Sequence, residues 1–228
     1  MKTLLVFLMI LFPSKHIDHI SIEFISEQPS IFHNYANDNF LQTVTLQSGN
    51  IVKLSIKNFG YIDIDLNFRI SLDKDYVKKL SNEERKTVEA LFHNTISLKS
   101  YLQNISWYVK DNISYKENSI FKRPEEVLIH KEANCIGYSA LVREMLNSIG
   151  INSKYVKGFF LKKKDEKDFI PVPHRWLEIS LPSGESFFYD PQYQGFTANY
   201  IVMDGNISFT EIKKFLIHLI ERKKKFIN

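Results

Sequence analysis

The sequence predicts an α+β fold, because the spacing of its hydrophobic residues changes once along the chain. Apolar and polar side chains alternate through residues 17–75, which is typical of half-buried antiparallel strands. From residue 80, apolar side chains recur every three or four positions, which is typical of helices. We expect three consecutive segments: a hydrophobic leader over 1–14, an accessory β-rich segment over 15–78 and a main domain over 79–228.

The leader combines one positive charge, at Lys2, with an uninterrupted apolar run from Leu4 to Phe12. This run is too short to cross a bilayer as a helix, which takes about 20 residues, so no stable membrane span is expected. The pattern favours a secretory signal peptide, although an Ala-x-Ala cleavage site is absent. An inner strand or an uncleaved hydrophobic arm is the alternative. We therefore expect an exported protein that is periplasmic, at the cell surface or secreted.

The accessory segment is expected to form antiparallel strands. A turn signal, Ser48-Gly49-Asn50, separates two of them. The alternating runs cover residues 20–24, 44–47, 51–56 and 61–68. This segment holds no combination of residues that indicates chemistry, so we interpret it as an extension of the main domain.

Two capping boxes, Ser81 to Glu84 and Ser208 to Glu211, predict the starts of helices in the main domain. A further helix is expected from Leu98 to about Asn112. The second capping box opens a predicted C-terminal helix, whose apolar stripe would pack on the core rather than on a membrane surface. This stripe consists of Ile212, Phe215, Leu216 and Leu219.

The charge pattern does not indicate a nucleic-acid partner. The 30 Lys and Arg residues exceed the 26 Asp and Glu residues by only four, and they are scattered. Two dense basic runs, 162–164 and 223–225, are interpreted as solvated surface. The single cysteine excludes a disulfide within the chain and a Cys-rich metal site, and no Cys/His cluster has ligand spacing. We expect neither a metal nor a cofactor.

The single cysteine, Cys135, is the candidate nucleophile. It follows Asn134, a good N-cap residue, and precedes an apolar-periodic run that Gly150 closes. Cys135 thus lies in the first turn of a predicted helix, where unpaired N–H groups and the helix dipole favour the thiolate. Gly137 is expected to leave room for a substrate backbone beside the sulfur. The alternative is a small buried hydrophobic residue.

His174 is the candidate proton acceptor for this thiol. It begins an alternating run in which Trp176 and Glu178 share its face of a predicted strand. Histidine is the usual partner of a catalytic thiol. The other histidines fall in predicted helices, in connectors or outside the main domain: His16, His19, His33, His93, His130 and His218.

Asp190 is the candidate carboxylate that orients His174. Pro182-Ser183-Gly184 fits a three-residue hairpin loop, with proline first and glycine third. With this loop Trp176 faces Asp190, and His174 is its diagonal neighbour on the same face. A two-residue loop would place Asp190 on the opposite face. The turn therefore selects the register in which carboxylate and imidazole meet.

These three residues together predict a catalytic triad. Cys135 would attack an acyl carbon, His174 would exchange the proton, and Asp190 would orient the imidazole and stabilise its charged form. The alternative is a buried cysteine, a structural histidine and a strand-end aspartate, each of which is common alone.

Several motifs around these residues resemble the transglutaminase-like superfamily, whose core is a papain-like cysteine fold. They follow the family's order over residues 98–195, and Cys135, His174 and Asp190 fall at its triad positions. Ala133 stands where the family often has glycine. The matching pieces are residues 105–115, 123–128, 134–138, 150–158, 174–176 and 189–191.

The resemblance implies a papain-like or transglutaminase-like core, with the catalytic cysteine at a helix start packed on an antiparallel sheet. It also implies thiol-dependent acyl transfer on peptide or glutamine amides through a thioester, by a peptidase, a deamidase or a transglutaminase, with a protein or peptide as substrate. For the oxyanion, the backbone N–H of Cys135 is a natural donor, and Trp107 or Tyr115 is a candidate second donor. The alternative is a non-catalytic binding or structural domain of a cell-envelope protein.

Overall fold

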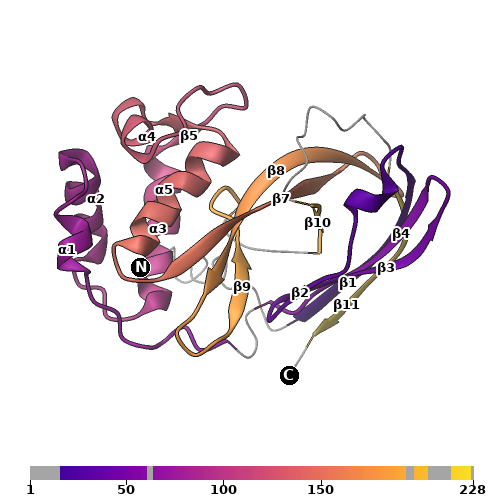
Figure 1. Cartoon of the computed structure of the whole chain (residues 1–228), viewed down its shortest axis with the longest axis horizontal. Coiled ribbons are helices and arrows are strands. Elements are labelled where there is room, and N and C mark those ends of the chain that lie inside the picture. Colours follow the sequence, from indigo (N-terminus) through magenta and orange to yellow (C-terminus); the bar gives the residue numbers. More distant parts are fainter. Residues whose placement is uncertain (1–15, 61–63, 194–197, 205–216, 227–228) are drawn as a thin grey trace, which may run out of the picture. The chain divides into compact units, whose positions relative to one another are not determined.

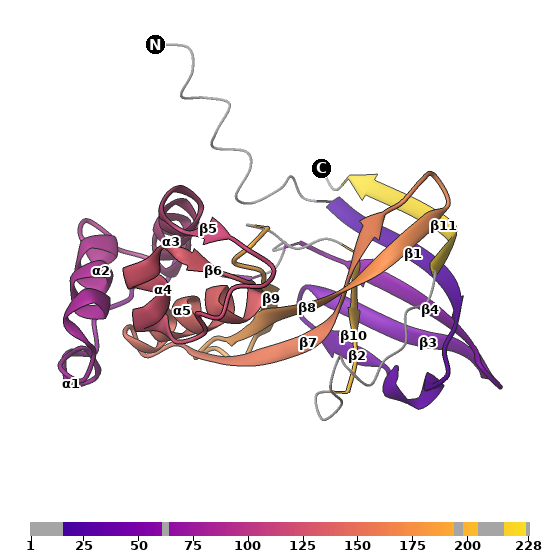
Figure 2. The same ribbon diagram turned by 90° about the horizontal axis from the view of Figure 1, so that it is seen from above.

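The structure, a computed structural model, describes residues 16–60, 64–193, 198–204 and 217–226. The predicted leader, 1–14, lies outside these residues. Contacts group the described chain into two compact units, shown in Figures 1 and 2. The first unit holds residues 64–155 and 176–193; the second holds the remaining described residues. The two units interleave along the chain, so they do not coincide with the three consecutive segments expected above, which stay a prediction.

The first unit carries the helices, and the capping signal at 81–84 is confirmed there. The Ser81 hydroxyl accepts a hydrogen bond from the backbone of Glu84 at 3.3 Å, and the Glu84 carboxylate accepts from the backbone of Ser81 at 2.8 Å. None of the helices that the structure describes has the length and hydrophobicity needed to cross a bilayer. The helices are α1 (Lys74–Val77), α2 (Asn82–Phe92), α3 (Leu98–Asn112), α4 (Pro124–His130) and α5 (Cys135–Asn147).

Apolar faces of α3 and α5 form much of the core of the first unit. Tyr101 on α3 is fully buried, and its hydroxyl donates to the backbone oxygen of Met145 on α5 at 3.2 Å. Ser106 on α3 shares a 2.6 Å hydrogen bond with the hydroxyl of Tyr189, at the end of β9 (Ser186–Tyr189). Both polar contacts lie in a dry interior, where an unmade hydrogen bond would be costly. They fix the helices and the hairpin that carries Asp190.

The expected strand over 61–68 is wrong where the structure describes it, because residues 64–68 pair with no strand. The segment is extended, but its carbonyls serve the start of a helix instead. Lys99 donates its backbone N–H to Leu66 O at 2.8 Å, and Leu98 donates to Phe68 O at 3.3 Å. Helix starts have N–H groups without partners inside the helix, so an extended neighbour is a suitable acceptor.

Nine of the described strands form one large antiparallel sheet in the order β10-β7-β8-β11-β1-β4-β3-β2, with β9 paired to β8. The N-terminal strands confirm the expected β extension, and Figure 2 shows β1, β3, β4 and β11 side by side. The bounds are β1 (His16–Ile25), β2 (Tyr35–Asn37), β3 (Phe40–Ser48), β4 (Ile51–Asn58), β7 (Asn152–Lys163), β8 (Asp168–Ser180), β10 (Tyr200–Val202) and β11 (Ile217–Phe226). The helices and this large sheet confirm the α+β class.

Within the second unit, the side chain of Gln42 on β3 forms hydrogen bonds with β10. These two strands lie near opposite ends of the strand order. The Gln42 amide donates to His33 O at 2.8 Å and to Val202 O at 2.9 Å, and its oxygen accepts from Val202 N at 2.9 Å. Asp204 also donates its N–H to Ile31 O at 3.0 Å. The two ends of the sheet are therefore linked to each other, and the second unit closes on itself.

The predicted C-terminal helix is wrong for residues 217–219, because they begin strand β11. Leu219 lies opposite Ile22 on β1, and the two strands pair over nearly their whole length. A bidentate ion pair from Arg222 to the buried Asp18 fixes this pairing, at 3.1 and 2.5 Å. The capping box at 208–211 and the stripe residues before Ile217 lie outside the described residues.

Candidate active site

Cys135 is the first residue of α5, and the predicted N-cap precedes it. The Asn134 side-chain oxygen accepts from the backbone N–H of Ile136 at 3.0 Å and of Gly137 at 3.3 Å. The Asn134 amide group donates to Ser119 O at 3.0 Å, so the cap is itself held by the chain before it. Cys135 is a free thiol and is partly exposed. The helix start thus presents the sulfur to solvent at the positive end of the dipole.

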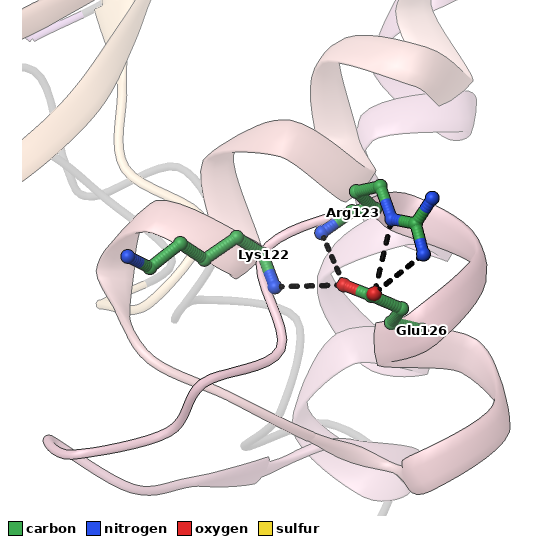
Figure 3. A network of polar contacts seen from close by, with 3 residues as sticks. All are labelled: Lys122, Arg123 and Glu126. Atoms are coloured by element: carbon green, nitrogen blue, oxygen red, sulfur yellow. Dashed lines mark hydrogen bonds and ion pairs between the residues drawn. The ribbon is translucent and has the colours of Figure 1, made fainter.

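The helix before the cysteine, α4, is fixed by a carboxylate at its own start. Figure 3 shows Glu126 accepting hydrogen bonds from the backbone N–H groups of Lys122 and Arg123, while the Arg123 guanidinium donates to its other oxygen at 3.0 and 2.7 Å. The Arg123 side chain and backbone hold the pKa of Glu126 below its usual range. Lys131 ends α4 in the left-handed conformation, with φ of 53°, and turns the chain toward Cys135.

Gly137 has a different role from the expected one. A Cβ atom built on it would lie 2.6 Å from Phe121 O and 2.8 Å from the Cβ of Ala133. The space beside this residue is therefore filled by the chain itself, so the expectation that it admits a substrate backbone is wrong. Glycine is needed because the segment before α5 packs directly against the first turn of the helix.

A short parallel pair, β5 (Ser114–Tyr115) with β6 (Glu132–Ala133), brings Tyr115 beside the nucleophile. Ser114 donates its N–H to Lys131 O at 2.8 Å, and Tyr115 lies opposite Ala133, two residues before Cys135. The Tyr115 ring stacks on that of Tyr138, with centroids 6.1 Å apart. Of the two candidate side-chain donors for an oxyanion, Tyr115 is thus the one built against the start of α5. Trp107 lies on α3, and its exposed fraction, 44%, equals that of Tyr115.

Two tyrosine hydroxyls lie in the electrostatic field of both Cys135 and Asp190. Burial raises the pKa of Tyr115, and electrostatic interactions with Cys135 and Asp190 raise it further. Burial likewise raises the pKa of Tyr193 to about 12, with contributions from the same two groups. Both hydroxyls therefore stay protonated at neutral pH and are able to donate hydrogen bonds. The sequence reasoning missed Tyr193, whose only signal is its position three residues after Asp190.

The hairpin before Asp190 has the predicted register. Leu177 pairs with Tyr189 and Ser180 with Ser186, so the same register places Trp176 opposite Asp190. Leu181 donates to Glu185 O at 2.8 Å, and Gly184 has a φ of +103°, which suits glycine at the third loop position. The three-residue loop is therefore confirmed.

Asp190 is fully buried at the end of β9. Its Oδ1 accepts from the backbone N–H of Gln192 at 2.9 Å. The Gln192 side chain in turn forms a hydrogen bond with the Tyr115 hydroxyl. A buried carboxylate needs such partners, because an ion without them would be strongly disfavoured in a dry interior. The loop after β9 thereby connects Asp190 to the tyrosine beside Cys135.

His174 lies on β8, two residues before Trp176, in the second unit. It is only 3% exposed and lies near aromatic rings on β7 and β10. Its ring centroid is 6.2 Å from that of Phe160 on β7 and 6.0 Å from that of Tyr200 on β10. Cys135 and Asp190 belong to the first unit, so the pairing of His174 with them stays a prediction.

Three other histidines have contacts that account for them. His19 forms a hydrogen bond with Ser55 at 3.0 Å, His218 contacts Asp168 at 3.1 Å, and His130 stacks on a phenylalanine ring with centroids 3.9 Å apart. Over the described ranges, no three His, Cys, Asp or Glu side chains are grouped as metal ligands.

Comparisons with known proteins agree with the motifs. Residues 85–191 match the family model described as the transglutaminase-like superfamily, and no curated protein matches the chain. One similar solved structure is a protein from Cytophaga hutchinsonii proposed to be a cysteine protease, with 11% identity, coverage of 93% of this chain and 90% of that one, and a TM-score of 0.49. Another is the periplasmic domain of TgpA from Pseudomonas aeruginosa, with 14% identity, coverage of 77% and 70%, and a TM-score of 0.47. The family match shows that residues 85–191 of this chain belong to the transglutaminase-like superfamily.

Proposed function

We propose that this protein is a thiol-dependent acyl-transfer enzyme that acts on peptide or glutamine amides. The observation that carries the proposal is the surroundings of Cys135. A partly exposed thiol opens a capped helix, and the Tyr115 hydroxyl lies in its field and in that of the buried Asp190. A helix start favours the thiolate, which is the reactive form. A structural cysteine needs neither the exposure nor these neighbours.

In the proposed reaction, Cys135 transfers its proton to His174 and its sulfur attacks the amide carbon. The tetrahedral intermediate collapses when the C–N bond breaks, and the leaving amine or ammonia takes the proton from His174. A thioester on Cys135 remains. Water or an amine then attacks the thioester while His174 accepts its proton, and the sulfur leaves and recovers that proton. Water as acceptor gives proteolysis or deamidation, whereas a lysine amine gives cross-linking.

Asp190 is the proposed partner of the His174 ring. The confirmed hairpin register supports this role, because Asp190 follows β9 opposite Trp176 and His174 is two residues from Trp176 on the same strand. A carboxylate there would select the tautomer and stabilise the imidazolium.

The oxyanion of the intermediate is proposed to receive two hydrogen bonds. One donor is the backbone N–H of Cys135, which begins the helix and has no partner within it. The other is the Tyr115 hydroxyl, which its raised pKa keeps protonated. Donors held in place before the reaction stabilise the developing charge without having to reorganise.

The decisive experiment has two parts. First, the folded protein is treated at neutral pH with an electrophile that mimics an amide, and a Cys135 adduct is sought by mass spectrometry. Second, a glutamine-containing peptide is incubated with the protein, with and without a primary amine. Deamidation, cleavage and amine addition leave products of different mass, so the result names the reaction. Absence of both adduct and product would favour the non-catalytic binding domain instead.

We also propose that the protein is exported, on the basis of Lys2 and the apolar run after it. Cell fractionation followed by N-terminal sequencing tests this. Intact residues 1–14 on cytosolic protein would contradict export.

A further inference from the structure

A hollow of about 480 Å³ lies at the C-terminal end of α3 in the first unit. It is lined by residues 109–115, by Tyr138, and by Pro191 and Gln192 from the loop after β9. The volume falls within the range of small-ligand sites. One wall is Tyr115, whose hydroxyl lies in the field of Cys135. The hollow is therefore a neighbour of the proposed acyl site and is separate from the sulfur itself.

The end of α3 supplies hydrogen-bond acceptors to this hollow. The helix ends at Asn112, and Ile113 continues as extended chain and donates its N–H to Val109 O at 3.0 Å. Within the part of the chain that the structure describes, no backbone N–H donates to the carbonyls of Asp111 and Asn112. Terminal carbonyls carry the negative end of the helix dipole, so they favour a cationic donor.

Gln192, in the loop after β9, adds another acceptor to the lining. Its side chain forms a hydrogen bond with the Tyr115 hydroxyl, and its Oε1 is buried without a hydrogen-bond partner among the described residues. A buried acceptor without a donor is unusual in a folded protein, and a bound ligand with N–H groups would satisfy it. This observation is independent of the helix end.

The charged side chains in the lining are Lys110 and Asp111, which are consecutive on the helix and so do not face the same direction. Their formal charges cancel, and the carbonyl groups leave the helix end partially negative. The exposed Tyr115 ring, which stacks on the buried Tyr138, offers a surface for an aliphatic stem and for a cation. The lining thus combines acceptors, a partial negative charge and aromatic faces.

We propose that this hollow is a subsite for a lysine or arginine side chain of the peptide substrate, next to the amide that Cys135 attacks. The inference rests on the proposed function, because the subsite has a catalytic role only if Cys135 forms the thioester. The charged end of the substrate side chain meets the α3 carbonyls, the Asp111 carboxylate and Gln192 Oε1. Its methylene groups lie along the Tyr115 ring.

Binding to the full-length Cys135→Ala protein tests the subsite without turnover. The probes are fluorescent peptides with one glutamine and, within three positions on either side, one lysine, arginine, norleucine or glutamate. We expect lysine and arginine peptides to bind several-fold more tightly than norleucine peptides, and glutamate peptides to bind most weakly. The preference should decrease at high salt. Equal binding of lysine and norleucine peptides would overturn the proposal.

A second variant in the Cys135→Ala background assigns the preference to the hollow. Asp111→Asn should reduce the advantage of lysine peptides, while Lys110→Gln should increase it. The matched control is Glu89→Gln, which removes an exposed helical carboxylate on α2 that does not line the hollow. A lysine preference that is unchanged in Asp111→Asn would contradict the site, provided that thermal denaturation shows an intact fold.

The two proposals fail separately. If the wild-type protein forms the Cys135 adduct but does not prefer peptides with lysine or arginine, the proposed enzymatic function is supported and the subsite is contradicted. If the protein prefers peptides with lysine or arginine but Cys135 is never labelled, the hollow is supported as a peptide-binding site and the enzymatic function is contradicted.

Discussion

The helix start that carries Cys135 differs from the strand that carries His174 in how each is held. Cys135 is partly exposed, and its position depends on its neighbour Asn134 and on a short β5–β6 pair. His174 is almost fully buried, and its ring is held by Phe160 and Tyr200 from other strands. The proposed nucleophile is thus positioned by local hydrogen bonds, whereas the proposed base packs against aromatic rings from other strands.

The largest effect is expected from Asp190→Asn. Turnover should fall by about 10⁴-fold, as in the serine-enzyme example of the triad, because asparagine favours the wrong histidine tautomer. The fold should survive, since the asparagine oxygen still accepts from Gln192 N. The measurement is kcat on the glutamine peptide, with thermal denaturation as the check on folding. Asp75→Asn, an exposed change on α1, is the matched control, and equal activity of both variants would remove Asp190 from the mechanism.

Tyr115→Phe is expected to lower kcat by about 10² to 10³-fold, the usual cost of losing one oxyanion donor. KM should change little, because the ring and its stacking on Tyr138 remain. The raised pKa of Tyr115 keeps the wild-type hydroxyl protonated, so the ratio between the two proteins should be constant from neutral to mildly alkaline pH. A variant with unchanged kcat would restrict Tyr115 to a packing role.

His174→Ala should slow alkylation of Cys135 severalfold in mildly acidic to neutral buffer, because the imidazolium no longer stabilises the thiolate. The decrease should vanish at alkaline pH, where the thiol ionises without help. Alkylation rates measured across this pH range test the pairing between the two regions directly. Superimposable profiles for variant and wild type would show that the two residues act independently.

The smallest effect is expected from Asn134→Ala, which should cost about 1 kcal/mol of stability through the lost N-cap. Urea denaturation measures this loss. Ser81→Ala removes an equivalent cap from α2 and should cost a similar amount. Only Asn134→Ala should also slow the alkylation of Cys135, since only that cap holds the helix start at the sulfur. A slower reaction in both variants would point to global destabilisation.

The sequence predicts the features of this site that depend on neighbours in the chain. Asn134 before an apolar run predicts the helix start, and a proline-to-glycine loop predicts the register at Asp190; both are confirmed. Local patterns carry this information because caps and tight turns form within a few residues.

Features that depend on distant partners could not be predicted in this way. The predicted apolar stripe of the C-terminal helix extended to Leu219. Residues 217–219 instead form a strand, because β11 pairs with the distant strand β1. Gly137 is required by the carbonyl of Phe121, which a local pattern does not reveal. Gln192 and Tyr193 enter the site only because the loop after β9 returns to Tyr115.

The Gln42 side chain has a consequence for solubility. The edge strands of a sheet expose unpaired N–H and C=O groups. Strands from other molecules can pair with these groups, which leads to aggregation. Gln42 donates to and accepts from Val202 as a neighbouring strand would, so one edge is capped by an amide from the far end of the same sheet. Gln42→Leu would leave the Val202 groups without partners and open this edge. The variant is therefore expected to self-associate at concentrations at which the native chain stays dispersed, which light scattering would detect.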